Sequence, residues 1–84
     1  MDIGQKIKEL RVAKGLTQEE LADRSELSKG FISQLERDLT SPSIATLMDI
    51  LQCLGTTVSE FFLGVRYDPF GLAAKFIINF LKIE

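Results

Sequence analysis

Between residues 29 and 37 the chain places polar side chains where they share one face of a helix. Residues three or four apart in a helix lie on the same side. Lysine donates to guanine acceptors and glutamine pairs with adenine, so these side-chain types suit contact with base edges. The alternative is the solvated face of a small helical bundle, but the pattern as a whole favours DNA. The residues of this polar face are Lys29, Gly30, Ser33, Gln34 and Arg37.

We expect two kinds of DNA contact from this region, base reading and backbone binding. The predicted base-reading residues are Lys29, Ser33 and Gln34. The predicted phosphate contacts are Gln18, Ser28 and Arg37, and we expect Phe31 either to touch a thymine methyl group or to pack at the helix edge.

Two short helices joined by a tight turn must position these side chains. Thr17 is a good N-cap and Glu20 follows three residues later, so this capping box starts the first helix at Gln18. Ser28 caps the second helix. This layout is typical of a helix-turn-helix, whose second helix lies in the major groove. The inward residues of the two helices are Leu21, Ala22, Ile32 and Leu35.

Three further helices are predicted from the apolar spacing, over residues 3–14, over residues 44–54 and from residue 58 onward. Gly15 follows the first as a C′ residue, and Thr57 with Glu60 opens the last. Five helices with short connections leave no room for a sheet, so the fold class is all-α. The expected inward residues are Ile3, Ile7 and Leu10, then Ile44, Leu47, Met48, Leu51 and Leu54, then Val58, Phe61 and Phe62.

Composition excludes several classes of chemistry. The chain has 84 residues, one cysteine and no histidine. A zinc site or a Cys/His dyad is therefore not expected, nor is an intrachain disulfide. We expect no enzyme activity, no metal and no cofactor, and we expect Cys53 to be a small buried thiol. Without a disulfide framework or a signal peptide, the expected compartment is the cytoplasm.

Over roughly residues 3 to 63, the sequence resembles the phage-repressor and Cro-like helix-turn-helix family, also called the xenobiotic-response-element family. The matching motifs are Leu16-Thr17-Gln18, Ala22, Ile32, the run from Gln34 to Arg37, and Ser41-Pro42-Ser43. One position departs from the pattern, because Glu26 stands where the family usually has a turn glycine. A positive φ at a residue other than glycine costs about 1 kcal/mol, so the turn could adopt a different geometry.

The resemblance implies a five-helix lambda-repressor-like DNA-binding domain over residues 1–63. It also implies that Arg11 and Glu36 form a structural ion pair, because both positions match the family's pattern. The competing interpretation is two unrelated surface charges.

Charge argues against tight DNA binding by one subunit. The net charge is −2, whereas many DNA-binding domains are basic. Backbone amides at helix N-termini can still hold phosphates. We therefore expect the chain to bind a double-stranded operator as a homodimer.

Residues 64–84 read as a connector followed by a strongly apolar tail. The tail is too short to span a bilayer, which needs about 20 apolar residues. It could pack on the helical core, form a dimer interface or bind another protein, and it could be a helix or a strand. Dimerisation is our first interpretation, because exposed apolar patches mark interfaces. The residues assigned to this interface are Leu72, Phe76, Ile77, Phe80, Leu81 and Ile83.

Two function classes fit these features. The first is a sequence-specific transcriptional regulator, which we expect to act as a repressor that binds a palindromic operator. The second is a protein-interaction module on the same fold, such as an antitoxin or an anti-repressor partner, acting through the apolar tail. An interaction module has no need for a long-reaching polar face on residues 29–37, so the first class is favoured.

Overall fold

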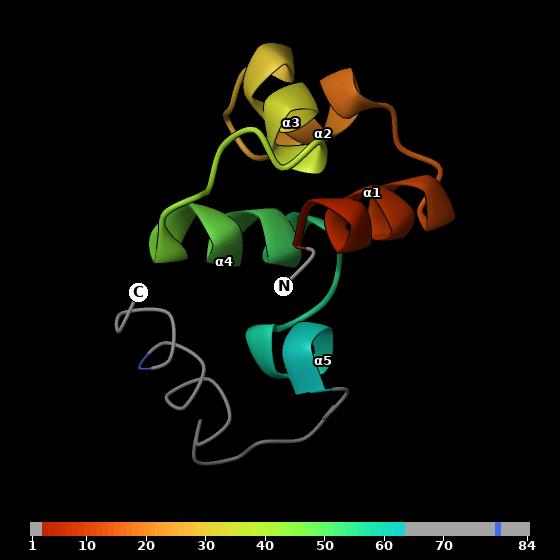
Figure 1. The fold of residues 1–84 in the computed structure, drawn as a ribbon. Coiled ribbons are helices and arrows are strands. Elements are labelled where there is room, and N and C mark those ends of the chain that lie inside the picture. Colours follow the sequence, from red (N-terminus) through yellow and green to blue (C-terminus); the bar gives the residue numbers. More distant parts are fainter. Residues whose placement is uncertain (1–2, 64–78, 80–84) are drawn as a thin grey trace.

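The computed structural model describes residues 3–63 and Asn79, and over residues 3–63 it contains five α-helices and no strand. The predictions for the tail residues Leu72, Phe76, Ile77, Phe80, Leu81 and Ile83 lie outside the described residues. Figure 1 shows α2 and α3 on one side of α1 and α4, with α5 on the other side. The predicted all-α fold is confirmed. The helices are α1 (Ile3–Ala13), α2 (Gln18–Arg24), α3 (Lys29–Glu36), α4 (Ile44–Cys53) and α5 (Val58–Leu63).

One hydrophobic core joins all five helices. The predicted core residues Leu21, Ile32, Leu35 and Leu47 are buried together, and Ile7 and Phe61 join them from α1 and α5. Partly buried residues surround this core, among them Leu10, Phe31, Cys53 and Phe62. Since apolar surface from each helix is buried against the others, α3 is held in a fixed rotation.

The inward face of α4 differs from the prediction, because Ile44 is only partly buried and Met48 faces outward. Met48 is 46% exposed, whereas Ile50 is completely buried. Leu47, Ile50, Leu51 and Leu54 form the buried stripe at helical spacing, and Met48 lies one position outside it. Both stripes satisfy helical periodicity, so the packing of α2 and α5 on α4 decides between them. Cys53 is also less buried than predicted, and its thiol donates to the Arg24 carbonyl at 3.3 Å.

Helices α2 and α3 end in the same unusual way. The residue after each C-cap has a positive φ without being glycine, 58° at Glu26 and 57° at Asp38. The Leu27 N–H donates to the Ala22 carbonyl at 2.8 Å, and the Leu39 N–H donates to the Gln34 carbonyl at 2.9 Å. These are the closing bonds of Schellman motifs. The turn before α3 therefore keeps the left-handed geometry usually made by glycine.

Helix α1 closely approaches the C-terminal end of α3. The Gly4 N–H donates to Asp38 Oδ1 at 3.1 Å. A Cβ atom at Gly4 would overlap the Leu35 carbonyl oxygen and lie 2.7 Å from Asp38 Oδ1. A side chain at position 4 would therefore push α1 away from α3.

Candidate nucleic-acid interface

The N-termini of α2 and α3 are fixed by side-chain caps. The Glu20 N–H donates to Thr17 Oγ1, and the Thr17 N–H donates to Glu20 Oε1, both at 3.0 Å. This is the predicted capping box. The bond from the Thr17 N–H lowers the pKa of the Glu20 carboxyl below its ordinary value. Ser28 caps α3, with its Oγ accepting from the Phe31 N–H at 3.0 Å.

Helix α3 has one buried side and one exposed side. Ile32, Leu35 and Glu36 are buried. The predicted base-reading residues lie on the other side, where Lys29 and Gln34 are exposed and Ser33 is half-buried. Three side chains with hydrogen-bonding groups are therefore available on the outer surface of this helix.

Arg11 and Glu36 form a buried ion pair between α1 and α3. Arg11 Nε lies 2.6 Å from Glu36 Oε2, and Arg11 Nη2 lies 3.0 Å from Glu36 Oε1. A third guanidinium nitrogen, Nη1, donates to the Leu16 carbonyl at 2.8 Å. The hydrogen bonds to Glu36 raise the pKa of Arg11 against the opposing effect of burial. The two side chains form a bidentate pair with two hydrogen bonds. This geometry best offsets the desolvation cost of burying two charges.

Gln18, the first residue of α2, is held by the same carboxylate. Its Nε2 donates to Glu36 Oε1 at 3.0 Å. A primary amide has two N–H donors, so one N–H remains for an acceptor outside the protein. The sequence predicted a phosphate contact at Gln18 but did not predict this anchor.

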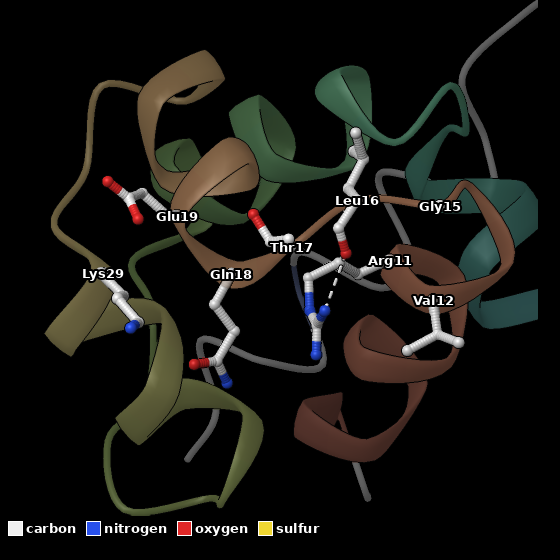
Figure 2. A pocket seen from close by; sticks show the side chains of 8 residues that line it. All are labelled: Arg11, Val12, Gly15, Leu16, Thr17, Gln18, Glu19 and Lys29. Atoms are coloured by element: carbon white, nitrogen blue, oxygen red, sulfur yellow. Dashed lines mark hydrogen bonds between the residues drawn. The ribbon is translucent and has the colours of Figure 1, made fainter.

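Two grooves flank Gln18. One has a volume of about 590 Å³, and in Figure 2 the Gln18 side chain lies between Lys29 and Arg11. The other, of about 430 Å³, is bordered by Lys8, Gln18 and Arg37. The first groove is lined by residues from the end of α1, the α1–α2 connection and the start of α2, together with Lys29: Arg11, Val12, Gly15, Leu16, Thr17, Gln18, Glu19 and Lys29.

Lys8 is a residue of this region that is not among the contacts predicted from the sequence. It is exposed and lines the second groove with Gln18 and Arg37. The sequence holds a signal for it, because Lys8 lies three residues before Arg11 and so on the same side of α1. The groove is also lined by the carboxylates of Glu36 and Asp38, which accept hydrogen bonds from Arg11 and Gln18 and from the Gly4 N–H, respectively. Lys8 and Arg37 are the groups at its rim that suit the binding of phosphate groups.

The other residues that were predicted to contact the DNA have different surroundings. Ser28 is exposed, although its oxygen is already used as a helix cap. Arg37 is exposed, and its Nε donates to the Ser33 carbonyl at 3.4 Å. Phe31 is partly buried and packs against the core.

The fold and the exposed face of α3 define a small helix-turn-helix domain. A family model described as "Helix-turn-helix" matches residues 7–61, which is more than half of the chain. The chain therefore belongs to the HTH_3 helix-turn-helix family. The family membership that the sequence resemblance predicted is confirmed. Members of this family are transcriptional regulators, not enzymes.

Relatives of known sequence support this assignment. The chain is 41% identical over 59 residues to the immunity repressor protein of Bacillus phage phi105, covering 70% of this chain and 41% of that protein. It is 39% identical over 69 residues to the HTH-type transcriptional regulator y4dJ of Sinorhizobium fredii, covering 82% of this chain and 90% of that protein. The chain thus spans less than half of the phage repressor and most of the Sinorhizobium protein.

Solved structures show the same fold. The restriction-modification controller protein C.AhdI from Aeromonas hydrophila superposes with a TM-score of 0.69 at 34% identity, covering 73% of this chain and 92% of that one. The biofilm regulator SinR, solved in complex with DNA, gives a TM-score of 0.66 at 38% identity, with coverage of 70% and 95%. Among the described residues, no helix has the length and apolarity needed to cross a membrane.

Proposed function

We propose that this protein is a sequence-specific repressor that binds a palindromic operator as a dimer, with α3 in the major groove. The exposed face of α3 carries the proposal. It presents Lys29, Ser33 and Gln34 to solvent while Ile32 and Leu35 fix the helix from behind. The phage relative is named an immunity repressor, and the SinR structure contains DNA, which supports this class of function.

Base reading falls to the side chains on this face. Lys29 is suited to the guanine atoms N7 and O6, and Gln34 is suited to the paired donor and acceptor of adenine. Ser33 lies between them and can donate or accept through its hydroxyl group.

Phosphate binding falls to the residues around the two grooves. Gln18 offers its free amide N–H, with its orientation fixed by Glu36. Arg37 and Lys8 supply positive charge on the same side. Ser28 can donate its hydroxyl hydrogen while its oxygen caps α3.

Dimerisation would supply the DNA affinity that a single subunit lacks. With a net charge of −2, a single subunit has a small electrostatic contribution to DNA affinity. Half-sites of helix-turn-helix dimers lie one helical turn apart, about 34 Å, so two copies of α3 must be held at that spacing. We assign the contact to the apolar residues of segment 64–84, which would pack on each other or on α5 of the partner.

Two measurements test this function. A gel shift with DNA from upstream of the protein's own gene should give a complex that an unrelated duplex of equal length does not displace. Deleting residues 70–84 should leave a folded domain that sediments as a monomer and binds this DNA far more weakly. A truncated chain that still sediments as a dimer would place the contact elsewhere, and a chain that shows no sequence preference would favour the protein-interaction module.

A further inference from the structure

Gly30 is a glycine in α3 for which the described structure offers no internal reason. It is the second residue of the helix and is exposed. A Cβ atom added there would meet no heavy atom of the described residues within 4 Å. Because glycine weakens a helix relative to alanine, this position carries a stability cost without a compensating contact.

The other glycines among residues 3–63 do have internal reasons. Gly15 and Gly55 adopt φ values of 72° and 73°, which side-chain-bearing residues rarely adopt. Gly4 lies where a side chain would overlap the Leu35 carbonyl. The reason for Gly30 must therefore be sought outside the described fold.

The position of Gly30 indicates what lies outside. Gly30, Ser33, Gln34 and Arg37 follow helical spacing, so they form one stripe along α3. Lys29 lies next to this stripe and is exposed. Gly30 is thus a gap in the side-chain layer at the N-terminal end of the face proposed to meet DNA, where the helix backbone is bare. Glycine allows a ligand to approach the backbone more closely than any other residue does.

We infer that Gly30 is a specificity-determining residue, at which DNA comes into van der Waals contact with the Cα atom of α3. This inference rests on the proposed function. The bare backbone lets the N-terminal end of α3 sit deep in the groove, so that Lys29 and Gln34 reach base edges on either side. A side chain at position 30 would hold the helix away from the DNA and weaken contacts that it does not itself make.

The test compares Gly30→Ala and Gly30→Leu with the wild-type protein in two measurements. Both replacements favour a helix and have open space around the new Cβ. Thermal unfolding should show Gly30→Ala melting about 2–4 °C higher than wild type. Fluorescence anisotropy uses a labelled duplex carrying the sequence that the wild-type protein enriches from a random pool. On this duplex, Gly30→Ala should bind about tenfold more weakly, and Gly30→Leu more weakly still.

Repeating the selection with Gly30→Ala distinguishes the two DNA surfaces that could lie against the Cα. A changed preference at one base position assigns the contact to a base edge, and uniform weakening assigns it to the sugar–phosphate backbone. The inference is overturned if Gly30→Ala binds within about twofold of wild type, or if it lowers the melting temperature, which would reveal an internal role. Failure of the wild-type protein to enrich any sequence would instead overturn the proposed function.

Discussion

Arg11 of α1 and Glu36 of α3 meet in a two-pronged ion pair, with heavy-atom distances of 2.6 and 3.0 Å. The same carboxylate accepts from Gln18 at 3.0 Å. Glu36 therefore connects α1, the start of α2 and the C-terminal end of α3. An interaction that holds the fold together also orients a side chain proposed to contact phosphate.

Replacing Glu36 with Leu should lower the free energy of unfolding by about 3 kcal/mol or more, because Arg11 would keep a buried charge without its partner. Urea unfolding of Glu36→Leu, Arg11→Met and the double variant measures this loss. The double variant should lose less than the sum of the single losses, since it buries no unpaired charge. Strictly additive losses would contradict the ion-pair account.

Replacing Gly4 with Ala should destabilise the protein by about 2 kcal/mol or more, because the new methyl group would overlap the Leu35 carbonyl. Urea unfolding gives the loss, and Gly30→Ala is the matched control because the same change there enters open space. An unchanged midpoint for Gly4→Ala would show that α1 does not approach α3 this closely.

Replacing Glu26 with Gly should stabilise the protein by about 0.5–1 kcal/mol, because the φ of 58° costs little for glycine. Asp38→Gly is the informative comparison. It relieves a similar φ of 57° but removes the carboxylate that accepts from the Gly4 N–H. Asp38→Gly should therefore gain less than Glu26→Gly in urea unfolding, and an equal gain would leave the Gly4–Asp38 bond without a role in stability.

The Glu20 cap should make stability depend on pH. The Thr17 N–H lowers the pKa of Glu20 below its ordinary value of 4.5 in the folded protein. The stabilisation is therefore present above pH 4.5 and is lost as the pH falls through the lowered pKa. Glu20→Gln keeps an acceptor but does not titrate, so its difference in unfolding free energy from wild type should shrink on acidification.

Urea unfolding at about pH 7 and about pH 3 measures this effect. Glu19→Gln is the matched control, because it removes a carboxylate from the same helical turn without touching the capping box. A difference between wild type and Glu20→Gln that stays constant across this range would contradict the capping role of the charged form.

Features fixed by local sequence were predictable. The caps at Thr17 and Ser28 depend on residues within three positions, and the structure contains both. The core residues of α2 and α3 follow from periodicity over a single helix. At α4, periodicity allowed either Met48 or Ile50 to face inward, so the choice depended on tertiary packing that one helix does not encode.

Contacts between residues far apart in the sequence were harder to predict. The bond from Gln18 to Glu36 spans 18 positions, and the bond from Gly4 to Asp38 spans 34. Neither follows from spacing within a helix. The Arg11–Glu36 pairing was expected only because the sequence resembles a known family. Gly30 belongs to the polar face predicted from the sequence, but the inference about its role depends on the finding that no described residue fills the space beside it.

The most direct test of sequence reading by α3 is the base preference of Gln34→Ala. The wild-type and variant proteins are measured against a set of duplexes with every single-base change in the selected operator. Gln52→Ala, an exposed glutamine on α4, is the matched control. We predict that Gln34→Ala loses about 1–3 kcal/mol of discrimination at one base position per half-site, with preferences elsewhere unchanged. Identical preferences for Gln34→Ala and wild type at every position would contradict the assignment of Gln34 to base reading.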